Sequence, residues 1–160
     1  MLTYELSSRD LEDVRVLETV VVGVGGGGLV SGIVTALDGR ARVIAVEPER
    51  SPAFSAGLAA GHSVRVETDT IADGLAPPFA GDLPLEICRG KVETVLVSED
   101  EIAEGMRFLY ERAKLACEPA GAAAAGAVLA GKVEAGLGVA VIVSGGNVEP
   151  QQAAAILRGQ

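Results

Sequence analysis

The chain has 160 residues and a formal net charge of -9, and 49% of its residues are apolar while 3% are aromatic. This length favours one domain with a hydrophobic core, and the composition excludes a disordered chain. The acidic balance argues against a general nucleic-acid surface, which needs clustered Lys and Arg. Two cysteines are too few for a disulfide scaffold and favour the cytoplasm. No leader or membrane span is expected, because five glycines interrupt the longest apolar run, 20–30.

The first third of the chain predicts a βαβ unit. A short helix is expected over 1–13, and a β-branched run without alternation over 17–24 predicts a strand buried on both faces. Four glycines at 25–28 follow, then a helix of small residues over 29–37 and a second buried strand over 42–47. Strand, loop, helix and strand in about thirty residues predict two parallel strands with a right-handed crossover.

The middle of the chain is less regular. A short helix is expected over 52–61 and a brief strand over 64–67. The segment 71–90 is rich in Pro and Gly, so we expect a loop with at most one short helix, over 83–88. Residues 92–97 predict a third strand.

The last third returns to regular alternation. Ser98 and Glu101 form a capping-box pattern that opens a helix extending to Ala113. Further elements are expected as an Ala- and Gly-rich helix over 120–131, a strand over 138–143 and a helix over 150–158. The alternation predicts an α/β fold over 1–160: a single domain with a doubly wound, mostly parallel sheet flanked by helices.

The four glycines between a buried strand and a helix indicate anion binding. Without Cβ atoms, their backbone amides can approach a phosphate at the positive end of the following helix. A tight turn without a ligand is the simpler alternative. A second alternative is a Rossmann-type NAD-binding domain, because Gly23-x-Gly25-x-x-Gly28 fits the dinucleotide pattern and Glu47 ends the next strand, where an acid would bind a ribose hydroxyl.

Five segments in order point to a more specific family. They are Val24-Gly-Gly-Gly-Gly-Leu-Val-Ser-Gly32, Val46-Glu-Pro-Glu49, Thr70-Ile-Ala-Asp-Gly-Leu-Ala76, Cys117-Glu-Pro-Ala-Gly-Ala122 and Val143-Ser-Gly-Gly-Asn147. Together they resemble the C-terminal half of the fold-type II pyridoxal-phosphate enzymes, in the threonine dehydratase and serine racemase branch. The resemblance extends from about Thr3 to the end of the chain.

The resemblance implies a cofactor site for pyridoxal 5'-phosphate. The residues implied at the cofactor phosphate are Gly25, Gly26, Gly27, Gly28 and the Leu29 amide. Ser144 would face the pyridine nitrogen, where a neutral hydroxyl leaves the ring less fully protonated than a carboxylate would. Glu118 would lie near the ring or its phenolic oxygen, and Gly74 would line the ring's edge.

The resemblance also implies a cation site, formed by Glu47 and a backbone carbonyl near Ser51. Some members of the family add an acid two residues after that carbonyl, where this chain has Ala53. The loss of one hard oxygen ligand makes a monovalent ion or water at least as good a fit as a divalent metal.

One family feature is missing from the sequence. The family links its cofactor to a lysine in a Ser-Phe-Lys-x-Arg-Gly-like segment, and none of Lys91, Lys114 and Lys132 stands in such a segment. The resemblance therefore implies part of an ammonia-lyase that eliminates water from L-threonine or L-serine to give a 2-oxo acid and ammonia. Alone, this chain is expected to be inactive and to pair with a complementing N-terminal segment or with copies of itself. A truncated, non-catalytic paralogue is the alternative.

Overall fold

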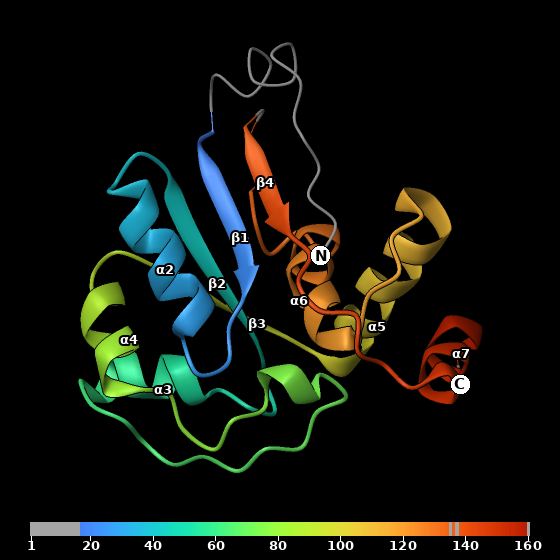
Figure 1. The fold of residues 1–160 in the computed structure, drawn as a ribbon, viewed down its shortest axis with the longest axis horizontal. Coiled ribbons are helices and arrows are strands. Elements are labelled where there is room, and N and C mark those ends of the chain that lie inside the picture. Colours follow the sequence, from blue (N-terminus) through green and yellow to red (C-terminus); the bar gives the residue numbers. More distant parts are fainter. Residues whose placement is uncertain (1–16, 135, 137, 160) are drawn as a thin grey trace.

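The computed structural model describes residues 17–134, 136 and 138–159, so the helix expected over 1–13 lies outside the described residues. Four parallel strands form one sheet in the order β3-β2-β1-β4 (Figure 1). The strands are β1 Thr19–Gly23, β2 Arg42–Pro48, β3 Glu93–Val97 and β4 Val139–Ile142. In the register of the sheet, Val21 of β1 pairs with Ile44 on one side and with Val141 on the other.

Helices cover both faces of the sheet, which confirms the doubly wound α/β fold (Figure 1). One face carries α2 Gly28–Leu37, α3 Ala53–Ala60 and α4 Asp82–Cys88, and the other carries α5 Glu99–Phe108, α6 Pro119–Leu129 and α7 Pro150–Arg158. Because side chains alternate along a strand, Val22 packs in the layer with Phe54 of α3, whereas Val21 packs in the layer of α6. None of the described helices is long and apolar enough to cross a membrane.

The brief strand expected over 64–67 was wrong. This stretch has no regular secondary structure, although the Val66 amide donates to the Pro78 carbonyl at 2.9 Å. The segment to which it is hydrogen-bonded contains Pro77 and Pro78, which have no amide hydrogen to donate. A continuous ladder of hydrogen bonds therefore cannot form there.

The helix expected to extend from Ser98 to Ala113 is present in two parts. Its capping box is confirmed: Ser98 Oγ accepts from the Glu101 amide at 3.3 Å, and Glu101 Oε2 accepts from the Ser98 amide at 2.7 Å. The α-helix α5 ends at Phe108, and the chain continues as the π-helical turn η2, Leu109–Ala113. The turn ends at Lys114, which has a left-handed backbone with φ of 58°.

The small-residue composition of α6 has a direct structural cause. This helix is buried from Pro119 to Ala127, between the sheet and α5. A Cβ on Gly105 of α5 would lie 2.6 Å from the Ala122 carbonyl oxygen, and a Cβ on Gly126 of α6 would meet the Glu101 carbonyl oxygen. The two backbones therefore touch at their crossing, which only glycine permits.

Candidate functional site

The fold has a topological switch between β1 and β4. The chain leaves β1 through α2 on one face of the sheet to reach β2, whereas it reaches β4 through α5 and α6 on the opposite face (Figure 1). The connections at the carboxyl ends of β1 and β4 therefore diverge. In open α/β sheets such a divergence creates the crevice in which ligands bind.

A cavity of about 200 Å³ lies at this switch. It is lined by the loop from Gly23 through the first turn of α2, by Gly74 and Leu75 of the 3₁₀ turn η1 (Asp73–Leu75), and by Ser144. The structure thus brings together the four glycines, Leu29, Gly74 and Ser144, which are more than a hundred residues apart in the chain at their extremes. Leu75 was not singled out from the sequence, although its place beside Gly74 could have indicated it.

The glycines of the loop meet two different steric demands. Gly27 has φ of 93°, and a Cβ there would lie 2.6 Å from Pro84 Cβ and 2.8 Å from Phe54 Cε2. A Cβ on Gly25 would lie 3.0 Å from Pro77 Cδ. A Cβ on Gly26 or Gly28, in contrast, would meet no atom within 4 Å. Packing and backbone conformation thus require glycine at position 27 and leave little room for a side chain at 25, whereas positions 26 and 28 leave open space where a ligand could approach the backbone.

The amides of this loop are available to an anion. The Val24 amide donates to the Val46 carbonyl at 2.7 Å, but the amides from Gly25 to Leu29 donate to no acceptor in the described part of the chain. The first turn of α2 contains no acidic residue, and no side chain caps the helix. The positive end of the helix dipole and several N–H groups without an acceptor among the described residues therefore lie at the cavity, which is the usual arrangement of a phosphate site.

Glu118 lies beside the cavity and joins three segments. It is the N-cap residue of α6, and its Oε2 accepts from the Asn147 amide at 2.8 Å. A Cβ on Gly74 would lie 3.2 Å from Glu118 Oε1, so this carboxylate oxygen is close to the loop that lines the cavity. Ser144 is half-buried and follows the carboxyl end of β4.

Glu47 is fully buried at the end of β2, away from the cavity lining. Its Oε2 accepts from the Phe54 amide at 2.9 Å and its Oε1 from the Ser55 amide at 2.8 Å, so the carboxylate caps α3. Burial raises the pKa of Glu47 above its ordinary value, and the hydrogen bonds to α3 oppose that shift. Because both oxygens are engaged and inaccessible, Glu47 is poorly placed to bind a nucleotide ribose, which disfavours the NAD alternative.

Comparison with known proteins identifies the family. Residues 2–145 match the family described as pyridoxal-phosphate dependent enzyme. The chain belongs to this family. It is 42% identical over 144 residues to the L-threonine ammonia-lyase of Thermotoga maritima, and the match covers 87% of this chain and 36% of that protein. It is 38% identical over 154 residues to the phenylserine dehydratase of Ralstonia pickettii, and this match covers 92% of this chain and 47% of that protein.

Solved structures of the family have the same fold. Maize serine racemase aligns with a TM-score of 0.78 at 33% identity, over 93% of this chain and 48% of that one. The resemblance to the fold-type II branch read from the sequence is therefore confirmed. The chain spans about a third to a half of the length of the relatives it matches, 36% and 47% in the two curated proteins above.

No lysine lines the cavity of this family member. Lys114 donates to the Glu111 carbonyl at 2.8 Å, and Lys132 donates to the Leu96 carbonyl at 3.0 Å. Lys91 lies at the opposite end of the sheet, beside a separate hollow formed with Arg42. These three are all the lysines of the sequence.

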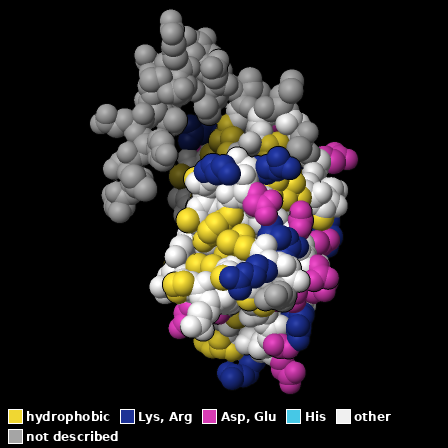
Figure 2. Space-filling view, turned by 90° about the vertical axis from the view of Figure 1, so that its right-hand side faces the viewer, with side chains coloured by type: hydrophobic (Ala, Val, Ile, Leu, Met, Phe, Trp, Pro, Cys, Tyr) yellow, Lys and Arg dark blue, Asp and Glu magenta, His cyan; other side chains and the backbone are white. Residues whose placement is uncertain are grey.

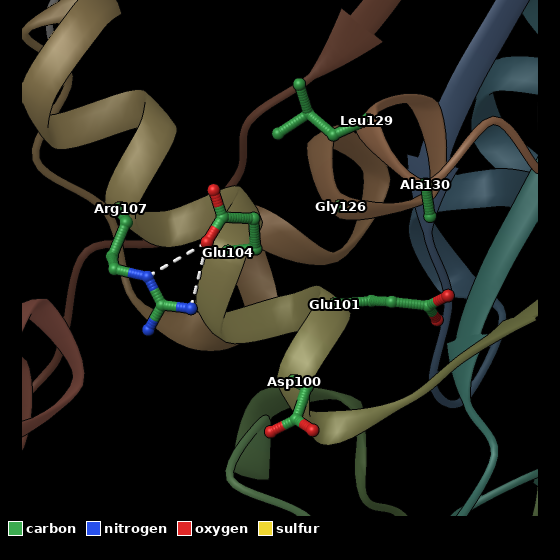
Figure 3. Close-up of a pocket in the computed structure, with 7 residues that line it drawn as sticks. All are labelled: Asp100, Glu101, Glu104, Arg107, Gly126, Leu129 and Ala130. Carbon is green, nitrogen blue, oxygen red and sulfur yellow. Dashed lines mark hydrogen bonds and ion pairs between the residues drawn. The ribbon is translucent and has the colours of Figure 1, made fainter. Parts of the chain in front are cut away.

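A larger hollow of about 320 Å³ lies between α5 and α6 (Figure 3). It has acidic walls, but Arg107 donates to Glu104 Oε2 at 2.9 and 3.0 Å, and Lys132 donates to Glu101 Oε2 at 2.6 Å. On the face seen in Figure 2, basic and acidic side chains separate the hydrophobic patches. Most of the charge in this hollow is thus already paired, unlike the free amides at the switch.

Proposed function

We propose that this chain is the cofactor-phosphate-binding part of a pyridoxal-phosphate-dependent ammonia-lyase. The observation that carries the proposal is the run of free amides from Gly25 to Leu29 at the positive end of α2. The open space above Gly26 and Gly28 is where a phosphate would approach them. Five donors and a helix dipole fit a phosphate dianion, and the family match names the cofactor that carries it.

The remaining residues of the cavity would hold the cofactor ring. When bound, pyridoxal phosphate supplies the electron sink that stabilises negative charge at the substrate's Cα. Ser144 would meet the pyridine nitrogen with a neutral hydroxyl, which holds a proton there less firmly than a carboxylate. Gly74 would leave room for the ring's edge, and Glu118 would lie next to it.

The reaction we propose for the complete enzyme is the elimination of water from L-threonine or L-serine, which gives a 2-oxo acid and ammonia. Relatives named threonine ammonia-lyase, threonine dehydratase and phenylserine dehydratase support this class of substrate. A weakly protonated ring suits an elimination, because the hydroxyl group leaves soon after the Cα proton and a long-lived carbanion is not needed. The two free, buried cysteines fit an enzyme of the reducing cytoplasm.

We propose that this chain alone is inactive and acts with a lysine supplied by another segment. The cavity lining contains no lysine, and relatives are two to three times as long. Apolar side chains near the glycine loop would form part of the contact: Leu29 is 48% exposed, Phe79 50% and Leu83 66%. Gly81, two residues from both Phe79 and Leu83, donates to the Gly26 carbonyl, so these side chains flank the proposed phosphate site. A second copy of the chain is the alternative partner.

The proposal also includes a cation position at the end of β2. Glu47 and the Ser51 carbonyl would be its ligands, but the Glu47 carboxylate already caps α3. The described residues contain no group of three or more His, Cys, Asp or Glu side chains that could hold a metal ion. With the carboxylate already bonded to two amides, a monovalent ion or a water molecule beside the Ser51 carbonyl fits this position at least as well as a divalent metal.

Calorimetric titration of the purified chain tests the proposal. We expect pyridoxal phosphate to bind and inorganic phosphate to compete with it. NAD should give no heat of binding. Borohydride reduction of the mixture followed by mass spectrometry should label no lysine stoichiometrically. Addition of the part of the Thermotoga maritima relative that the match leaves uncovered should then restore release of a 2-oxo acid from L-threonine or L-serine. Affinity for NAD without affinity for pyridoxal phosphate would overturn the proposal, and binding without restored release would favour a non-catalytic paralogue.

A further inference from the structure

One residue, Glu118, makes both hydrogen bonds that hold the loop after β4 in the described part of the chain. β4 ends at Ile142 and α7 begins at Pro150, so Ser144 lies beyond the last residue that pairs in the sheet. Among the described residues, the segment 144–148, which we call the Ser144 loop, makes two hydrogen bonds. The Glu118 amide donates to the Gly145 carbonyl at 3.3 Å, and the Asn147 amide donates to Glu118 Oε2 at 2.8 Å. Both bonds involve Glu118.

The glycines around Glu118 are placed to accommodate its carboxylate. Gly145 has φ of 95°, and a Cβ there would clash with Glu118 Oε1 and lie 2.7 Å from the carboxylate carbon. On the other side, a Cβ on Gly74 would lie 3.2 Å from the same oxygen. Gly146, the next residue of the Ser144 loop, has no such restriction, because its nearest neighbour would be the Ala116 carbonyl oxygen at 3.9 Å. Glycine at position 145 therefore leaves the space that the carboxylate occupies, whereas glycine at 74 makes room both for the carboxylate and for Ala120 Cβ, which would lie 3.0 Å from a Cβ there.

The position of Glu118 at a helix N-terminus offers a simpler explanation, in which its charge stabilises the helix dipole. The observed contacts argue against that as its main role. The Glu118 side chain makes no capping hydrogen bond to the amides of α6. Its hydrogen-bonded oxygen instead points to the Ser144 loop, which belongs to a different part of the chain.

We infer that Glu118 is a positioning residue, which holds the Ser144 loop against the N-terminus of α6 and thereby sets the place of the Ser144 hydroxyl in the cavity. This inference rests on the proposed function for the role of Ser144. The attachment of the Ser144 loop to Glu118, which we call the clamp, is a property of the protein alone. Glu118 acts through an acceptor oxygen and not through its charge. An amide side chain of the same shape should therefore replace it, and a methyl group should not.

Hydrogen exchange at the Asn147 amide in the full chain tests the clamp, with Glu118→Gln and Glu118→Ala as the variants. We expect the alanine variant to lose at least tenfold in protection at this amide and the glutamine variant to retain most of it. If Glu118 acted through its charge on the dipole of α6, both variants would lose protection equally, because both remove the charge. Equal protection in wild type and Glu118→Ala, or equal loss in both variants, would overturn the inference.

Binding measurements connect the clamp to Ser144. The probes are inorganic phosphate and 4'-deoxypyridoxine 5'-phosphate, which has the cofactor's ring but no aldehyde to react. Glu118→Ala should weaken binding of the ring compound about tenfold and shift its ultraviolet band, whereas in a Ser144→Ala background it should change neither further. Its effect would then run through Ser144 and not through direct contact with the ring, and the affinity for phosphate should stay unchanged. Unchanged affinity and an unchanged band for the ring compound would overturn the link to Ser144. If wild type binds neither probe, the proposed function fails, while the exchange experiment still decides the clamp.

A second pair of variants avoids changing Glu118. Gly145→Ala places a methyl group where the Glu118 carboxylate lies and forces an alanine into a left-handed backbone. It should therefore reproduce the loss of protection at Asn147 that is expected for Glu118→Ala. Gly146→Ala, one residue later and with room for the methyl group, should behave like wild type. A Gly145→Ala protein with full protection at Asn147 would contradict the inference even if the Glu118 variants failed to fold.

Discussion

Two neighbouring glycines of the loop provide the sharpest test of how the site is built. Gly27 and Gly28 are adjacent in the chain, yet a Cβ on Gly27 would lie 2.6 Å from Pro84 Cβ, and a Cβ on Gly28 would meet nothing within 4 Å. The same substitution, glycine to alanine, should therefore damage stability at one position and ligand binding at the next.

The expected magnitudes follow from the local geometry. An alanine at position 27 must adopt φ near 93°, which costs about 1–2 kcal/mol, and must displace Pro84 or Phe54. With the cost of overpacking included, Gly27→Ala should lower the free energy of unfolding by about 2–5 kcal/mol. Gly28→Ala begins a helix with a better helix former, so its stability should be unchanged or higher by up to about 1 kcal/mol.

Phosphate affinity should follow the opposite order. A methyl group on residue 28 occupies the open space through which the phosphate would reach the amides. Loss of one charge-assisted hydrogen bond corresponds to about 1.5–3 kcal/mol, which raises the dissociation constant for phosphate roughly tenfold to hundredfold. Urea unfolding measures the first quantity, and calorimetry with inorganic phosphate measures the second. A folded Gly28→Ala protein with wild-type phosphate affinity would refute the assignment of the glycine loop as the phosphate site. A Gly27→Ala protein as stable as wild type would refute the steric reasoning.

Three further predictions concern the rest of the fold. Gly126→Ala should lower stability by about 3 kcal/mol in urea unfolding, because its methyl group meets the backbone of α5, whereas the exposed helical control Gly32→Ala should not be destabilised. Glu47 has a raised pKa, so ionisation opposes folding; the stability of wild type relative to Glu47→Gln should therefore decline as pH rises from 4.5 through the folded pKa. A flat difference across that window would contradict the cause given for the shift. Burial raises the pKa of Cys117 to about 11, so iodoacetamide at pH 8 should modify it in the unfolded protein and hardly at all in the folded one.

Local signals explain how much of the fold could be predicted. The first unit was expected as a strand over 17–24, a helix over 29–37 and a strand over 42–47, and the structure has β1, α2 and β2 within two residues of those bounds. Buried β-branched runs and a glycine loop carry this information within the segment itself. The failure at 64–67 has the opposite cause, because whether that stretch forms a strand depends on prolines that lie opposite it in space.

The site could be predicted in part for the same reason. Its amide donors belong to one continuous loop, so the sequence alone indicated an anion site. The supports of that loop come from elsewhere: Phe54 and Pro84 pack where a Cβ of Gly27 would be, and nothing near the loop in sequence announces them. The cap that Glu47 provides to α3 was equally hidden, because an acid at a strand end has the same pattern whether it meets a ribose, a cation or a helix.

The Gly- and Ala-rich composition therefore answers two separate demands, and mutations can distinguish them. At the crossing of α5 and α6, the absence of Cβ atoms lets two backbones touch, so substitution there should lower stability and leave the geometry of the phosphate site intact in the molecules that fold. At Gly26 and Gly28, the absence of Cβ atoms leaves space for a ligand, so substitution should spare the fold. A composition that served packing alone would give stability losses at both places. Independent responses of stability and phosphate affinity would mean that the loop glycines are retained for binding.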